Sequence, residues 1–325
     1  MMNKTETPQW VKNVVHTCMG LQRGEKVLIA VDEPLGHARD LLLAEAAKTD
    51  PAELWSYTLP NARRPLDAYP SALLNLMTEA DAIILLLASM NPAKELPAWN
   101  GGKAAIVKGT ARAGIGAFID QSILDLEMSA DYEQIAVFTA SLAERLRGSS
   151  SARVTTALGT DLRMSLEGRE WRTDTGILRG RGVFGNLPSG EIYIAPIEDS
   201  AEGVLVIDKC LPGTLLTEPV RVVFEKGRVI EVEGSAGAEF LRNAFDQHGE
   251  SARVVAELGI GTNPKARLQG NIITDEKVLG TVHVAVGRND FLCGKNVATI
   301  HIDGVVGQPT LEIDGKTVIE NGKHL

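Results

Sequence analysis

The sequence of 325 residues is poor in cysteine, in clusters of basic residues and in long apolar runs, and each shortage excludes a class of protein. Its three cysteines lie far apart and form no CxxC pair, which argues against a disulfide framework or a structural zinc site. The net charge of -9 and the absence of Lys or Arg runs argue against nucleic acid or an anionic membrane as a partner. The longest apolar run, residues 82–90, is too short to span a bilayer. A small or neutral ligand is therefore the expected partner.

The composition is that of an ordinary globular protein, with 44% hydrophobic and 23% charged residues. The first ten residues, "MMNKTETPQW", lack the apolar core of a signal peptide. We therefore expect a soluble, cytoplasmic protein. A chain of this length also has room for two domains.

The first half alternates helix and strand patterns. We expect strands at residues 27–31, 52–59 and 82–87 and in "GKAAIVKGT", residues 102–110, with helices between them. This alternation of strands and helices predicts an α/β fold with a mainly parallel sheet and helices on both of its faces.

The segment "RGSSSARV" is the best candidate for a linker, because it places three serines beside a glycine. We place the boundary there, with an N-terminal α/β domain over residues 1–148 and a C-terminal β-rich α+β domain over residues 149–325. The second domain should contain hairpins that turn at residues 225–227 and 314–315, and one helix that follows Ser235.

Common catalytic and nucleotide motifs are missing from the sequence. The letters "GRGVFG", residues 180–185, match a dinucleotide fingerprint but neither follow a strong apolar strand nor open a helix, so they predict a glycine-rich loop. The sequence also contains no Walker loop, nucleophile elbow or HExxH motif.

Two histidines, His283 and His301, stand inside segments made of Val, Ile, Ala and Thr. An unpaired polar group in such a strand costs a few kcal/mol unless it is satisfied. Asp303 lies two residues after His301, so both side chains project from one face of a strand. Metal ligation is one explanation for this placement, and a core histidine bonded to the backbone is the other.

Several carboxylates are candidates to complete a metal site. Glu257 and Glu191 stand at the ends of apolar strands, where functional side chains are common, although an exposed strand end explains them equally well. Asp275 and Glu276 form an acidic pair of the kind that is usually solvated, and Asp290 has the sequence context of a turn residue.

Three long segments resemble the aminopeptidase T (M29) family of metallopeptidases, of which this chain would be a short variant. They are "GNLPSGEIYIAPIEDSAEGVLVID", "AELGIGTNPKARLQGNIITDEKVLGTVHVAVG" and "ATIHIDGVVG". The resemblance covers the whole chain and is strongest over residues 185–307. It implies a set of six metal ligands: Glu191, Glu257, Glu276, His283, His301 and Asp303.

This donor set suits two divalent ions such as Zn, Co, Mn or Fe, with Glu257 as the expected bridge. Two metals about 3.5–4 Å apart activate a water and polarise a scissile carbonyl, which is the chemistry of an aminopeptidase. The resemblance therefore implies a metal-dependent hydrolase that releases N-terminal residues from small peptides. It also implies a homodimer with the sites facing an internal cavity.

The sequence departs from the family at one place that matters for catalysis. Family members resemble each other in carrying a tyrosine a few residues after the "GTVH" histidine, and Asp290 occupies that place here, so we name Asp290 as the candidate catalytic residue. The chain is also shorter than a typical family member between His283 and His301.

Two alternatives to the hydrolase stay open. The "EDSAEG" segment with a later His-x-Asp also resembles the 2,5-dihydroxypyridine dioxygenases, which hold one Fe(II) by two histidines and one aspartate. In that branch a histidine stands at the position of Glu257. The third class is a catalytically inactive binding protein on the same scaffold.

Overall fold

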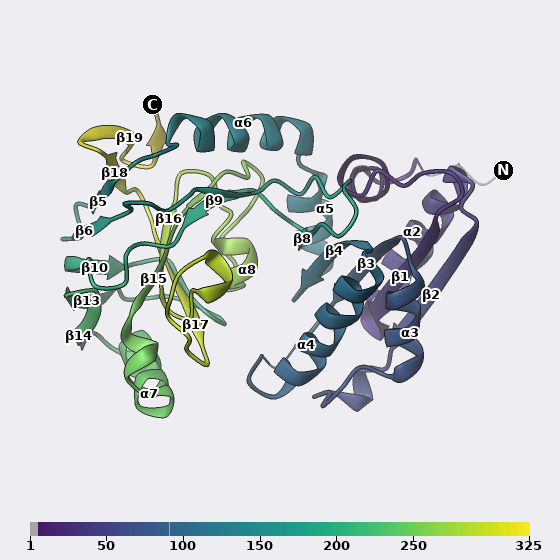
Figure 1. Cartoon of the computed structure of the whole chain (residues 1–325), viewed down its shortest axis with the longest axis horizontal. Coiled ribbons are helices and arrows are strands. Elements are labelled where there is room, and N and C mark those ends of the chain that lie inside the picture. The colour runs from purple at the N-terminus through teal and green to yellow at the C-terminus, as the bar shows by residue number, and fades with distance from the viewer. Residues whose placement is uncertain (1–5, 91) are drawn as a thin grey trace. The chain divides into compact units, whose positions relative to one another are not determined.

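The polypeptide crosses three times between two structural units in a computed structural model that describes residues 6–90 and 92–325 (Figure 1). The first unit contains the described residues through Ala136 together with Asp174–Ser189, and the second contains Val137–Thr173 and Gly190–Leu325. The predicted domain boundary after residue 148 stays a prediction, because these units are defined by proximity and not by independent folding.

The first unit is built on a sheet of five parallel strands in the order β2-β1-β3-β4-β8. The strands are β1 (Lys26–Asp32), β2 (Glu53–Leu59), β3 (Ala82–Leu87), β4 (Arg112–Ala117) and β8 (Phe184–Asn186). The helices are α1 (Gln9–Lys12), α2 (Gly36–Ala46), α3 (Ser71–Glu79), α4 (Pro92–Gly109) and α5 (Gln121–Asp125). A π-helical segment, Asn13–Cys18, continues α1.

Alternating residues of the central strand β1 face two different hydrophobic clusters, because successive strand residues point to opposite faces. Ile29 packs in one cluster with Leu42 of α2, and Leu28 packs in the other with Leu73 of α3 and Ile106 of α4. Helices therefore cover both faces of the parallel sheet, as the sequence predicted.

The segment "GKAAIVKGT" was predicted as a strand and this is wrong, since it forms the end of helix α4. Ala105 and Ile106 are buried in the core beside the sheet, whereas Val107 is exposed, so only one side of this part of the helix is buried. A short apolar run does not distinguish a strand from one buried turn of a helix. The fourth strand is the next segment, β4. The fifth, β8, comes from the "GRGVFG" region and pairs with β4.

The second unit consists of two sheets. Their orders are β14-β13-β10-β6-β5-β18-β19-β20 and β12-β11-β17-β16-β15-β9-β7. The strands are β5 (Ser151–Thr155), β6 (Asp161–Ser165), β7 (Arg172–Asp174), β9 (Glu191–Ile194), β10 (Glu202–Ile207), β11 (Cys210–Leu211), β12 (Thr214–Leu215), β13 (Val220–Glu225), β14 (Arg228–Glu233), β15 (Val255–Gly261), β16 (Val282–Gly287), β17 (His301–Val306), β18 (Thr310–Ile313), β19 (Lys316–Glu320) and β20 (Lys323–His324). The helices of this part are α7 (Ala236–His248) and α8 (Ile272–Asp275), and α6 (Tyr132–Arg145) crosses from the first unit.

The antiparallel pairings confirm both predicted hairpins, β13–β14 and β18–β19. The predicted helix after Ser235 is α7, although the Ser235 side chain makes no capping hydrogen bond. One hydrophobic core lies between the two sheets and contains residues from both, such as Leu162 of β6 and Val284 of β16. The predicted fold class is confirmed. Among the described residues, no helix combines the length and the apolar character needed to cross a membrane.

Candidate metal centre

The candidate ligands share one face of the seven-stranded sheet because the strands that carry them alternate. In β16 Val282, Val284 and Val286 belong to the core, so His283 points to the opposite face. The neighbouring strands follow the same pattern, and together they place five candidates on that face: Glu191 of β9, Glu257 of β15, His283 of β16, and His301 and Asp303 of β17.

The strand register brings these side chains into neighbouring rows. Ala285 lies opposite Glu257 on one side and Asp303 on the other, so a small residue separates two carboxylates. Gly259 lies opposite His283 in the next row. Directly opposite residues on one face are the closest side-chain neighbours in a sheet. The register therefore gathers the candidate ligands that lie on strands.

Gly259 leaves the space that the His283 ring occupies. A methyl group at Gly259 would lie 1.9 Å from Nε2 and 2.1 Å from Cε1 of His283, far inside any real contact. The absence of a side chain at this position allows the ring to lie across the neighbouring strand. The position of the His283 ring therefore depends on glycine at residue 259.

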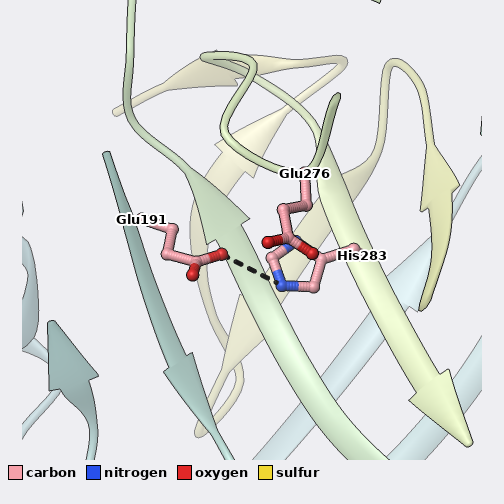
Figure 2. Close-up of side chains that lie close together, drawn as sticks. All are labelled: Glu191, Glu276 and His283. Atoms are coloured by element: carbon pink, nitrogen blue, oxygen red, sulfur yellow. Dashed lines mark ion pairs between the residues drawn. The ribbon is translucent and has the colours of Figure 1, made fainter. Parts of the chain in front are cut away.

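The ligand atoms form two clusters of three. One contains Glu191, Glu276 and His283, and the other contains Glu257, His301 and Asp303, with the atoms of each cluster within 4.8 Å of one another. Figure 2 shows the first cluster, with Glu276 reaching in from the turn that follows α8 and the Glu191 carboxylate facing the His283 ring. The distance from His283 Nε2 to Glu191 Oε2 is 3.4 Å.

Glu257 links the two clusters. Its Oε1 lies 3.3 Å from Nε2 of His283, and its Oε2 lies 3.3 Å from Nε2 of His301. The same His301 nitrogen lies 3.4 Å from Oδ2 of Asp303. One carboxylate therefore directs each of its oxygens toward a histidine of a different cluster, which is the arrangement of a bridging ligand.

Burial and opposite charges shift the pKa values of these groups in both directions. Burial raises the pKa of Glu257, but hydrogen bonds with His283 and His301 outweigh it and lower that pKa to about 2. Burial lowers the pKa of His283, yet the surrounding carboxylates raise it to about 9, and they raise the pKa of His301 well above its ordinary value. Burial raises the pKa of Glu276 to about 8, with the charges of Glu191 and Asp303 adding to the rise and the Lys277 ammonium opposing it.

A hydrogen bond behind His301 fixes the orientation of its ring. Nδ1 donates to the carbonyl of Arg288 at 2.7 Å, which leaves Nε2 directed at the carboxylates. The loop that supplies this carbonyl is held by Glu198, which accepts hydrogen bonds from the Asn289 side chain at 3.1 Å and the Lys295 amide at 2.6 Å. Arg169 pairs with the other Glu198 oxygen at 2.7 Å.

The residues present fit the binding of divalent metal. Oδ1 of Asp303 is buried, and no hydrogen-bond partner for it lies among the described residues. A buried carboxylate oxygen without a donor is costly, and a cation would satisfy it. Four carboxylates and two imidazoles form a donor set that suits Zn, Mn, Co or Fe.

The structure gives definite positions to the carboxylates for which the sequence left alternatives. Glu257 lies within β15 and not at its end, and it is only 6% exposed. Asp275 is fully buried, and 13% of the Glu276 side chain is exposed, so the acidic pair is not a solvated surface feature. Asp290 belongs to neither cluster and pairs with Arg288, whose hydrogen bond lowers the pKa of that carboxyl. The ligand and catalytic roles themselves stay predictions.

Three residues that shape the centre were not predicted from the sequence: Gly259, Glu198 and Lys277. The Lys277 side chain is completely buried, and its Nζ lies 2.6 Å from Glu191 Oε1 and 2.5 Å from Glu276 Oε1. A lysine after two acids looks like an ordinary charged turn. A glycine opposite a histidine becomes visible only once the strand register is known.

A family model described as NicX, 2,5-dihydroxypyridine 5,6-dioxygenase, matches residues 21–325. The chain belongs to this family. Among curated proteins it is 30% identical over 178 residues to aminopeptidase T of Thermus thermophilus, an alignment that covers 48% of this chain and 43% of that protein. It is 26% identical over 191 residues to the 2,5-dihydroxypyridine 5,6-dioxygenase of Pseudomonas putida, covering 54% and 55% of the two chains.

Two solved structures share the fold at 19% identity. The Pseudomonas putida dioxygenase matches with a TM-score of 0.75 over 98% of this chain and 96% of its own. The Thermus thermophilus aminopeptidase AmpT matches with the same TM-score over 98% of each chain. The predicted resemblance to aminopeptidase T is therefore confirmed for the fold. The relatives are enzymes of two classes, and the alignments with the curated ones span about half of their length.

Proposed function

We propose that the chain is a two-metal hydrolase that releases N-terminal residues from small peptides. The observation that carries this proposal is the position of Glu257, whose two oxygens face His283 and His301 in different clusters. A bridging carboxylate between two three-residue clusters suits two ions better than one. The relatives named aminopeptidase T support the same reaction class.

The protein side chains would hold the two ions in two half-sites. Glu191, Glu276 and His283 form one half-site, Asp303 and His301 form the other, and Glu257 serves both. When bound, a pair of divalent ions supplies an activated water and polarises a carbonyl oxygen. The surrounding carboxylates favour the ammonium group of a peptide N-terminus, and the Arg288 carbonyl keeps the His301 ring in place.

A mononuclear Fe(II) dioxygenase is the second candidate, and the family model favours it. That chemistry requires two histidines and one carboxylate on a single metal. Here His283 and His301 belong to different clusters, and a glutamate occupies position 257. Since the donor atoms are divided between two positions, the hydrolase is the better supported of the two.

Metal analysis of the purified chain together with two assays tests the proposal. We expect two divalent ions per chain at saturation and hydrolysis of leucine p-nitroanilide or a dipeptide. One ferrous ion with oxygen uptake on a dihydroxypyridine would overturn the hydrolase in favour of the dioxygenase. Metal binding without either reaction would instead support an inactive binding protein.

The variant Glu257→Ala tests the bridge. Because both half-sites share this residue, we expect the variant to lose both ions at metal concentrations that saturate the unaltered chain. Glu231→Ala, a change at an exposed glutamate of β14, is the matched control and should retain both. A full complement of two ions in Glu257→Ala would show that Glu257 does not bridge.

A further inference from the structure

Lys277 is a buried cation inside the cluster of Glu191, Glu276 and His283. Its side chain is 0% exposed, and its Nζ contacts one oxygen of Glu191 and one oxygen of Glu276. A buried ammonium group is stable only when it is paired, so this arrangement is a built part of the centre.

The backbone around Lys277 is held firmly against β15. Its carbonyl accepts a hydrogen bond from the Asn263 amide at 2.9 Å, and its own amide donates to the Thr274 carbonyl at 3.0 Å. A methyl group at Gly261 would lie 2.7 Å from the carbonyl carbon of Lys277, which shows how closely the turn approaches the strand. The backbone of the lysine is therefore fixed beside the cluster.

Lys277 contacts only one of the two oxygens of the Glu191 carboxylate. Oε1 of Glu191 lies 2.6 Å from the ammonium group, whereas Oε2 lies 3.4 Å from Nε2 of His283. Glu191 can thus offer one oxygen to an ion beside His283 while the other remains on the lysine. The same holds for Glu276, whose Oε1 also contacts Nζ.

The two half-sites consequently differ in whether their own carboxylates are already paired with a cation, since Glu257 is common to both. Glu191 and Glu276, beside His283, each contact the Lys277 ammonium. For Asp303, beside His301, and for the shared Glu257, the contacts of the described residues show no lysine or arginine. A positive charge a few ångströms away opposes the binding of a divalent ion, and a buried site screens that effect only weakly.

We propose that Lys277 makes the two half-sites unequal, so that the site of Glu257, His301 and Asp303 fills first and the site beside His283 binds a weaker, exchangeable ion. This inference rests on the proposed two-metal function. It adds that the chain passes through a defined one-metal form as the metal concentration rises. The second ion would then limit activity when metal is scarce.

Titration of the metal-stripped full chain with Mn²⁺, followed by electron paramagnetic resonance and calorimetry, tests the proposal. We expect two dissociation constants that differ at least tenfold. Asp303→Asn should weaken the tight ion, and Glu191→Gln should remove the weak ion while the tight one changes less than threefold. Two equal constants in the unaltered chain, or loss of the tight ion in Glu191→Gln, would overturn the proposal.

Lys277→Met removes the charge with little change in length. We expect the second ion to bind at least tenfold more tightly in this variant and the first ion to be unchanged. Lys316→Met, at an exposed lysine of β19, is the matched control. If Lys277→Met does not fold, the Glu191→Gln titration still decides, because it requires no change at the lysine.

The outcomes separate this inference from the proposed hydrolase. Unequal binding without any peptide hydrolysis would support the role of Lys277 and contradict the hydrolase. Hydrolysis with two equal ions would do the reverse. A second ion that appears only in Lys277→Met would support the lysine as a substitute for that ion and contradict a two-metal reaction in the unaltered chain.

Discussion

Replacement of Gly259 by alanine should disrupt the centre without altering any ligand. The added methyl group would lie 1.9 Å from Nε2 of His283, and real contacts of this kind are not shorter than 3.0 Å. A small rotation of the ring would not relieve the overlap, since the added methyl group would also lie 2.1 Å from Cε1 and 2.7 Å from Cδ2 of His283. His283 must therefore move by on the order of 1 Å or more, a displacement that costs roughly 100-fold in a reaction that depends on alignment.

We expect Gly259→Ala to lose binding of the ion beside His283 and to lower kcat/KM for an aminoacyl p-nitroanilide by about 100-fold. The free energy of unfolding should fall by about 1–3 kcal/mol, the usual cost of overpacking. Calorimetric metal titration, steady-state kinetics and urea unfolding measure these three quantities. The strand should survive, because its pairing with β9 and β16 involves only the backbone.

Gly36→Ala is the matched control, since a methyl group there meets no atom within 4 Å. It should leave metal binding and activity unchanged. If Gly259→Ala bound two ions with unaltered affinity, then the placement of the His283 ring across Gly259 would be wrong, and with it the division of the ligands into two clusters.

Three other predictions concern the surroundings of the ligands. Glu198→Ala should weaken metal binding by about 10- to 100-fold, because the loop that supplies the carbonyl behind His301 loses its hydrogen bonds to Glu198. Calorimetry measures this affinity. An unchanged affinity would contradict the role of Glu198 in orienting His301. In the metal-free chain the pKa of His283 is raised from 6.5 to about 9, so the protonated ring stabilises the folded state. This stabilisation is fully present below pH 6.5 and is lost as the pH rises through 9. Thermal unfolding in a chelator should therefore give a Tm that falls between pH 6.5 and 9, and a flat Tm would contradict the pairing of His283 with carboxylates. If Asp290 takes the place of the family tyrosine, Asp290→Asn should lower kcat at least tenfold with little change in KM; an unchanged kcat, with a rise in Asp290→Tyr, would show that Asp290 is a bystander.

The sequence predicted the fold class because the apolar periodicity of the strands is strong. The strand at residues 27–31 is a continuous apolar run, which is typical of a strand buried on both faces of a parallel sheet. The segment at residues 102–110 was misassigned because its short apolar run fits a helix and a strand equally well. No local sequence pattern predicts that residues 184–186 pair with β4 in the first sheet, since the pairing of distant segments is decided by packing.

The ligands were predictable from residue type and from family resemblance, but their division was not. His301 and Asp303 alternate within one segment, so a shared face follows directly from the strand period. The sharing of Glu257 between two histidines depends on the register of three strands, which no local pattern encodes. Lys277 was missed for a related reason, because a charged residue in a turn is normally solvated and only the tertiary structure buries it.

Crystals grown with saturating Mn²⁺ would test the central claim most directly, through an anomalous difference map at the manganese edge. We predict two peaks about 3.5–4 Å apart, on either side of the Glu257 carboxylate, one beside His283 and one beside His301. A single peak at saturation, held by His301 and Asp303 with no second ion beside His283, would contradict the two-metal centre.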